Sequence, residues 1–259
     1  MQIATFDLGA LLVSFLRVSG FMFTTPVFGS KLVPTTIRVW LALLVAVVLM
    51  PALMSAGELP AIASGAFMIV AVREVLLGLL IGFVSSFFLY GIEFAGHVVG
   101  LQMGFGTATL FDPVTENEVS VLGTFKGMLA VTLFLVTNGH HEVLSTFASS
   151  YRVIPPGGSG LAAAGVGGMV AATAGIFNVA VRVSIPMLSA LLMAEVGLAL
   201  LAKTVPQMNI FVVGFPVKVM LGLAVFGFSV PYIGMIIVKA INAANFDLRM
   251  ILSALGGGR

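Results

Sequence analysis

The stretch AFMIVAVREVLLGLLIGFVSSFFLYGIEF, residues 66–94, decides the fold, because only Arg73, Glu74 and Glu93 carry charge within it. Backbone groups in hydrocarbon find no water, so a long apolar run must satisfy its own N–H and C=O groups, as a helix does. About twenty apolar residues cross a bilayer. This stretch is long enough to cross while tilted or to extend past the membrane, and we predict a membrane-spanning helix here.

The rest of the chain has the same character. Of its 259 residues, 59% are hydrophobic and 8% are charged, whereas soluble domains average about 45–50% apolar and about 25% charged residues. We therefore predict an all-α membrane protein with about six to eight long, partly broken helices. Besides residues 66–94, the apolar stretches are Leu8–Phe28, Ile37–Ser55, Val121–Thr137, Ala162–Leu201 and Ile210–Val238.

Prolines, glycines and polar residues mark the breaks between these stretches. Pro186 is expected to kink or split the stretch 162–201, which at about forty residues is too long for one crossing. The most polar internal loop is Gly104–Glu118, and Pro155–Gly160 is a flexible break. We expect this break to divide the chain into a front part, 1–155, and a back part, 161–259.

The two ends of the chain give conflicting signals on topology. Asp7 precedes the first apolar stretch and Arg17 interrupts it, so we expect this segment to be retained and not cleaved as a signal peptide. Lys239 and Arg249 favour a cytoplasmic C-terminus, yet six crossings would then place Lys31 outside, against the positive-inside rule. Either the number of crossings is odd or some stretches do not cross, and both interpretations stay open.

Several charged residues lie in or at the ends of the apolar stretches, where a central charge costs roughly 2.5–3.5 kcal/mol on the insertion scale. These charged side chains either pair between helices or line a water-filled pathway. The structural alternative is that they extend to the membrane interface and place their charges in water. Glu93 and Lys218 belong to this group. The residues that we assign to assembly or intramembrane pairing are Arg17, Arg73, Glu74, Lys126, Arg182 and Glu195.

No catalytic, metal or cofactor site is expected. The run Asn138–Glu142 reads Asn-Gly-His-His-Glu, but position 145 is serine, so the His-Glu-x-x-His zinc motif is incomplete. Its Asn-Gly pair instead predicts a turn after Thr137. Ser149 and Ser150 lack the partners of a serine protease, and the chain has no cysteine. With a net charge of +2, we predict neither an enzyme nor a nucleic-acid partner.

Three motifs together go beyond composition. The first is Arg17 followed by Pro26-Val27-Phe28-Gly29, Pro34 and Arg38. The second is Gln102-Met103-Gly104-Phe105-Gly106 with Asp112-Pro113 downstream. The third is Lys203 followed by Pro206-Gln207-Met208-Asn209-Ile210-Phe211, Gly214-Phe215-Pro216-Val217-Lys218 and Gly222. In these motifs, and over nearly its whole length, the chain resembles the FliR family of flagellar biosynthetic proteins, whose injectisome relatives are the SctT proteins. The residue sequence of the third motif favours the flagellar branch of the family over the injectisome branch.

This resemblance implies a subunit of the core export gate of the flagellar type III secretion apparatus, in the bacterial inner membrane at the flagellar basal body. The front part would be FliP-like and the back part a FliQ-like helical hairpin. The implied partners are FliP-like and FliQ-like membrane proteins in a mixed complex, an FlhB-like switch protein, unfolded exported flagellar subunits and the lipid bilayer. The alternative is a secondary transporter or channel for a small solute, which broken helices and intramembrane charges would suit.

The resemblance also implies roles for two sets of residues. Residues 102–113 would form a loop that plugs the pore, where apolar side chains close a narrow channel by excluding water. Its members are Gln102, Met103, Gly104, Phe105, Gly106, Leu110, Phe111, Asp112 and Pro113. The second set would form a hairpin tip at a subunit contact. Its members are Lys203, Pro206, Gln207, Asn209, Phe211, Gly214, Phe215, Pro216 and Lys218. Plain interhelical turns are the alternative for both sets.

Overall fold

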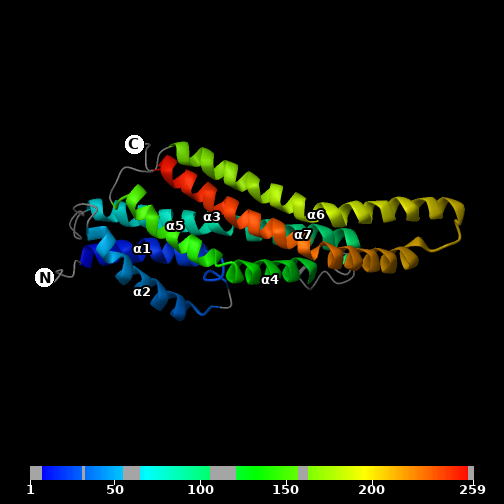
Figure 1. The fold of residues 1–259 in the computed structure, drawn as a ribbon, viewed down its shortest axis with the longest axis horizontal. Coiled ribbons are helices and arrows are strands. Elements are labelled where there is room, and N and C mark those ends of the chain that lie inside the picture. The colour runs from blue at the N-terminus through cyan, green and yellow to red at the C-terminus, as the bar shows by residue number, and fades with distance from the viewer. Residues whose placement is uncertain (1–7, 31–32, 55–64, 106–120, 157–162, 256–259) are drawn as a thin grey trace. The chain divides into compact units, whose positions relative to one another are not determined.

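The computed structural model describes residues 8–30, 33–54, 65–105, 121–156 and 163–255. Within these ranges the chain forms α-helices and no strand (Figure 1), which confirms the predicted all-α class. The helices are α1 (Leu8–Thr24), α2 (Thr35–Met54), α3 (Gly65–Met103), α4 (Val121–Val136), α5 (Gly139–Val153), α6 (Ala163–Thr204) and α7 (Ile210–Leu255).

Among the described residues, three helices, α3, α6 and α7, are long and apolar enough to cross a membrane. A fourth span results if α4 and α5 are taken together as one broken segment, and α1 and α2 are shorter apolar helices. Of the kink or split expected at Pro186, the split does not occur, because α6 continues through this residue. Met187 and Leu191, which follow the proline, are fully buried, so packing holds the helix together where one backbone hydrogen bond is lost.

The structure contains one helix that the apolar stretches did not indicate, α5. Its sequence, GHHEVLSTFASSYRV, is polar on one side, so a search for continuous apolar runs passes over it. A break at Thr137 and Asn138 separates it from α4, which confirms the turn predicted from the Asn-Gly pair. Asn138 takes the left-handed conformation, with φ 58° and ψ 23°, and its carbonyl accepts from the His141 N–H at 2.9 Å.

The left-handed conformation of Asn138 leads to a prediction. Asn138→Val is expected to destabilise the chain by about 1–2 kcal/mol, because a β-branched side chain clashes with the backbone there, whereas Asn138→Gly is expected to be neutral. Denaturant unfolding of the two variants in detergent measures the difference. Equal stability of the valine and glycine variants would show that the turn does not depend on this conformation.

The described helices belong to two compact units. Unit 1 is Met1–Phe87, Asn138–Ala174 and Asn242–Arg259, and unit 2 is Phe88–Thr137 and Gly175–Ile241. Both the front part, 1–155, and the back part, 161–259, contribute to each unit, so the predicted division of the sequence is not a division of the packing. In unit 2, α6 and α7 run antiparallel on either side of the link 205–209 (Figure 1).

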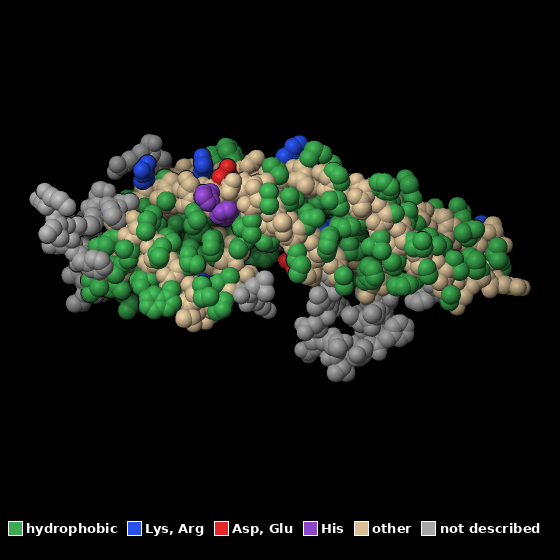
Figure 2. All heavy atoms as spheres, turned by 60° about the horizontal axis from the view of Figure 1, so that its bottom comes forward, with side chains coloured by type: hydrophobic (Ala, Val, Ile, Leu, Met, Phe, Trp, Pro, Cys, Tyr) green, Lys and Arg blue, Asp and Glu red, His purple; other side chains and the backbone are tan. Residues whose placement is uncertain are grey.

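Much of the surface is apolar. Large hydrophobic side chains are exposed on α3, α6 and α7 and on the shorter α2, and Figure 2 shows such side chains spread over the face in view. Among them are Trp40 on α2 at 67% exposure, Met193 on α6 at 76% and Phe228 on α7 at 88%. Such a surface is stable only against lipid or other apolar protein surfaces.

Candidate functional site

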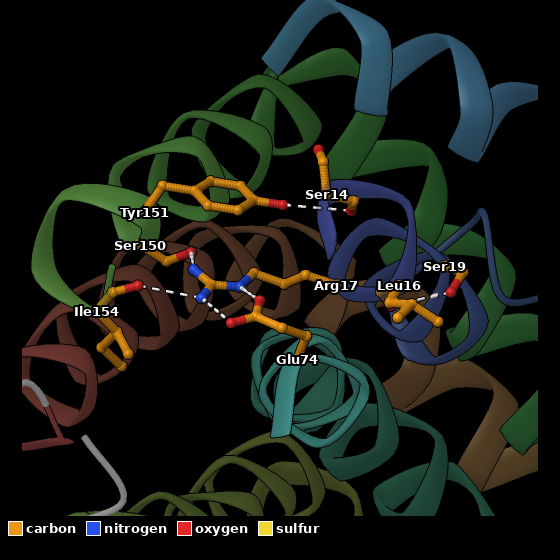
Figure 3. A network of polar contacts seen from close by, with 8 residues as sticks. All are labelled: Ser14, Leu16, Arg17, Ser19, Glu74, Ser150, Tyr151 and Ile154. Carbon is orange, nitrogen blue, oxygen red and sulfur yellow. Dashed lines mark hydrogen bonds and ion pairs between the residues drawn. The ribbon is translucent and has the colours of Figure 1, made fainter. Parts of the chain in front are cut away.

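A buried ion pair joins α1 to α3 in unit 1. Arg17 is fully buried and Glu74 is 2% exposed. The Arg17 Nε donates to Glu74 Oε2 at 2.5 Å, and its Nη2 donates to Oε1 at 2.9 Å (Figure 3). These two parallel bonds form the fork that guanidinium and carboxylate groups favour. Each charge is therefore matched inside the chain, away from solvent.

Helix α5 completes the coordination of the guanidinium. Arg17 Nη2 also donates to the carbonyl of Ile154 at 3.0 Å, and Nη1 donates to Ser150 Oγ at 3.4 Å. The Tyr151 ring lies over the guanidinium, with its centroid 4.2 Å from the Arg17 Cζ, and its hydroxyl donates to the carbonyl of Ser14 at 3.5 Å (Figure 3). The network ties three helices together, which is the geometry of a structural clamp and not of a wet pathway.

Glycines bring α1 and α3 close enough for this pairing. A Cβ added at Gly20 would lie 2.6 Å from the Val75 carbonyl oxygen, and one at Gly78 would overlap the Arg17 carbonyl oxygen. Thr24 Oγ1 donates to the Leu79 carbonyl at 3.0 Å across the same contact. Gly82, four residues after Gly78, also faces α1, because a Cβ there would lie 2.6 Å from the Phe21 carbonyl oxygen; small residues at this spacing let two helix backbones approach closely. Backbone contact between the helices thus aligns Arg17 with Glu74.

A second polar cluster lies in unit 2 and centres on Glu195 of α6. Lys218 of α7 donates from Nζ to Glu195 Oε1 at 2.5 Å, and Gln102 of α3 donates from Nε2 to Glu195 Oε2 at 2.8 Å. Lys218 is 20% exposed and Glu195 is 43% exposed. One carboxylate therefore bridges three helices at a partly exposed position.

The end of α3 packs beside this cluster. Met103 is fully buried in an apolar cluster with Val99, Leu122, Met187 and Leu191. A Cβ added at Gly222 would lie 2.6 Å from the Met103 Cε, so Met103 fits against a bare helix backbone. Gly104 has φ +95°, and a Cβ there would lie 3.1 Å from the Phe215 ring. The start of the predicted pore loop and the predicted hairpin tip are thus in contact within one unit.

The structure corrects the predicted start of the pore loop. Gln102 and Met103 belong to the last turn of α3 and not to a loop, since the helix continues until Gly104 takes its positive φ. Phe105 packs against the apolar cluster around Met103. The remaining members of that set lie outside the described residues: Gly106, Leu110, Phe111, Asp112 and Pro113.

The residues of the predicted hairpin tip lie around the link between α6 and α7. Lys203 is in the last turn of α6, Pro206 and Gln207 are exposed in the link, and Asn209 precedes α7. The Val212 N–H donates to the Asn209 Oδ1 at 3.3 Å, which is a helix N-cap. The others lie in the first turns of α7: Phe211, Gly214, Phe215, Pro216 and Lys218.

The other charged residues that were assigned to pairing, Lys126, Arg73 and Arg182, form no ion pair with another described residue. Lys126 of α4 is 1% exposed, and its Nζ has no hydrogen-bond partner among the described residues; the Phe226 ring centroid lies 5.8 Å away. Arg73 is half-buried and Arg182 is exposed. Neither takes part in the ion pairs between described residues, which are Arg17–Glu74 and Lys218–Glu195. The described residues also contain no group of three His, Cys, Asp or Glu that could hold a metal ion.

Sequence reasoning missed the contribution of α5 to the first cluster. From the sequence, Ser150 is weighed only as a protease residue, and no role is predicted for Tyr151 or Ile154. The signal that could have found them is helical spacing: Val143, Phe147, Ser150, Tyr151 and Ile154 are all buried and recur at intervals of three and four residues.

Comparisons with known proteins identify relatives of this chain. Over residues 8–244 the chain matches the model of a family described as bacterial export proteins, family 1. It is 31% identical to the flagellar biosynthetic protein FliR of Escherichia coli strain K12, over 84% of this chain and 83% of that protein. It is 28% identical to the flagellar biosynthetic protein FliR of Bacillus subtilis strain 168, over 95% of this chain and 96% of that protein.

A relative outside the flagellar group also matches. The chain is 30% identical to the Yop proteins translocation protein T of Yersinia pestis, over 56% of this chain and 57% of that protein. The flagellar matches cover more of the chain than this one does. Because the family match runs from α1 far into α7, this protein belongs to family 1 of the bacterial export proteins.

Proposed function

We propose that this chain is a subunit of the core export gate of a flagellar type III secretion apparatus, where it forms part of the pore for unfolded flagellar subunits. The observation that carries the proposal is the similarity to flagellar biosynthetic proteins over 84% and 95% of the chain. The names of the relatives describe flagellar biosynthesis and protein translocation, not a catalysed reaction. We accordingly propose a role in assembly and passage without enzymatic activity.

The resemblance to the FliR family implies the partners that we propose, and the surface supports a role in an assembly. Exposed Arg182 lies on α6 next to exposed Val181 and close to exposed Ile185. A guanidinium is costly against acyl chains but is readily matched by a carboxylate of another polypeptide. FliP-like and FliQ-like membrane proteins in a mixed complex would cover such faces, and an FlhB-like switch protein would dock on the complex. We place the assembly in the inner membrane at the flagellar basal body.

Purification in mild detergent tests the assembly. Expressed with its neighbouring export genes, the chain is expected to co-purify in a stable complex with two smaller membrane proteins. Expressed alone, it is expected to aggregate, because the apolar surface lacks its cover. A monodisperse homo-oligomer that transports a small solute in liposomes would contradict the export gate and support the transporter.

The pore plug that we propose for residues 102–113 gives a further prediction. Deleting residues 107–111, which lie outside the described part of the chain, is expected to make the membrane leaky to small ions while the complex still assembles. The reason is that an apolar constriction that excludes water blocks ion passage. Ion-sensitive dyes in whole cells and native gels of the complex provide the two measurements. An unchanged leak in a fully assembled complex would remove the plug assignment.

A further inference from the structure

The Glu195 cluster has more connections than a single ion pair. Its carboxylate accepts from Lys218 through one oxygen and from Gln102 through the other, so a single side chain joins α3, α6 and α7 within unit 2. Glu195 is 43% exposed and Lys218 is 20% exposed. A carboxylate that is bonded through both oxygens is fixed in direction as well as in place. The arrangement therefore calls for an explanation beyond the attraction of one ion pair.

The position of Gln102 supplies that explanation. Gln102 lies in the last turn of α3, immediately before the point where Gly104 turns the chain with φ +95°. Met103 and Phe105 hold this end through apolar contacts with the cluster around Met187 and Leu191. Apolar contacts are non-directional, whereas a hydrogen bond weakens steeply when its angle is lost. The bond from Gln102 to Glu195 is thus a directional restraint on the rotation of the last turn of α3.

Lys218 in turn orients Glu195. A carboxylate on α6 without a cation would favour water over the partly apolar surroundings of this unit, and the Lys218 ammonium at 2.5 Å holds it toward α7. A Cβ added at Gly104 would lie 3.1 Å from the Phe215 ring, and Phe215 is three positions before Lys218 on α7. The polar and the apolar contacts therefore act on the same end of α3 from the same hairpin.

We propose that Glu195 is a positioning residue that holds the end of α3, Gln102–Phe105, against the α6–α7 hairpin and so keeps the gate in its non-conducting arrangement. The second half of this statement rests on the proposed export-gate function, and the first half does not. Glu195 acts through Gln102. Loss of its carboxylate frees the last turn of α3 without removing the apolar contacts that fold unit 2.

The test uses the full chain in its assembled complex and compares Glu195→Ala with Glu93→Ala, a matched control at an exposed glutamate on α3 of the same unit. Hydrogen exchange at residues 99–105 is expected to rise by about tenfold in Glu195→Ala and to stay unchanged in the control. The passage of small ions in cells is expected to rise in the same variant while native gels show normal assembly. Glu195→Gln is expected to fall between the two, because its amide oxygen still accepts one hydrogen bond.

A charge swap separates positioning from mere packing. In the double variant Glu195→Lys with Lys218→Glu, the ion pair is restored with reversed direction, and the Gln102 amide oxygen can accept from the new ammonium. We expect the swap to bring hydrogen exchange and ion passage back toward the wild-type values. A swap that behaves no better than Glu195→Ala would overturn the proposal, and so would equal exchange in Glu195→Ala and Glu93→Ala.

Complementation keeps the two proposals distinguishable. If the wild-type chain fails to restore secretion of flagellar subunits in a strain that lacks it, the export-gate function is wrong, and hydrogen exchange still decides whether Glu195 positions the end of α3. If secretion is restored but Glu195→Ala changes exchange without changing ion passage, the gating half of the inference is overturned while the export function stands.

Discussion

Replacing Arg17 by methionine is expected to destabilise unit 1 by about 3–5 kcal/mol, because Glu74 then stays buried without its cation. Glu74 is 2% exposed, and the only ion pair that involves it among the described residues is the one with Arg17. The carbonyl of Ile154 and the hydroxyl of Ser150 lose a donor in the same change. Denaturant unfolding of the variant in mixed detergent micelles measures the loss.

A double variant shows whether the loss comes from the unpaired charge. Arg17→Met combined with Glu74→Leu replaces the whole pair by apolar side chains of similar size, and such replacements are often neutral in other proteins. We expect the double variant to recover most of the stability that Arg17→Met removes. A double variant as unstable as the single one would mean that the pair contributes by its own attraction and that burial of an orphan charge is not the cause.

Gly78→Ala is expected to cost about 3 kcal/mol, the upper range for overpacking, although it adds only one carbon. The new Cβ would overlap the carbonyl oxygen of Arg17 and lie 2.8 Å from the Phe21 nitrogen. Both obstacles are backbone, which cannot change rotamer, so α1 and α3 must separate. Gly197→Ala is the matched control, because nothing lies within 4 Å of a Cβ there; alanine at that helical position is expected to be neutral or to stabilise by up to about 1 kcal/mol.

The two sets of variants are coupled. Separation of α1 from α3 by Gly78→Ala also pulls Arg17 away from Glu74, because Gly78 lies one helical turn after Glu74 on α3. The losses of unfolding free energy in Gly78→Ala and in Arg17→Met, added together, are therefore expected to exceed the loss measured in the double variant. Strict additivity, measured by the same denaturant unfolding, would show that the glycine contact does not position the ion pair.

The long helices could be predicted from the sequence because lipid-compatible helices need continuous apolar runs. The run that identifies α3 is unbroken over most of its length, and the structure extends it by one residue at its start, to Gly65, and from residue 94 to Met103 at its end. The end of α7 was underestimated because Asn242, Asp247 and Arg249 interrupt the apolar pattern beyond Val238. Helix α5 was missed for the same reason, since its apolar residues appear at helical intervals and not in a row.

The members of the polar clusters could be predicted better than their partners. A charge in an apolar run is conspicuous by itself, but Arg17 and Glu74 are 57 positions apart, and nothing local pairs them. The same holds for Gln102 and Glu195, which are 93 positions apart. Packing of the glycine faces decides which charges meet, and this is tertiary information. Lys126 is an example. Its burial can be predicted from the apolar run around it, but the group that would match its charge cannot be predicted from the sequence.

The order in which a ribosome delivers the parts of the Arg17 network has a consequence for biogenesis. Glu74 emerges 57 residues after Arg17, and Ile154 emerges 137 residues after it. At elongation rates of about 5–20 residues per second, the guanidinium waits roughly 3–11 s for its carboxylate and roughly 7–27 s for the α5 carbonyl. During that interval a nascent α1 carries an uncompensated charge, so the insertion machinery must shelter it, and slow translation between residues 17 and 74 would lengthen the period in which quality-control proteases can act.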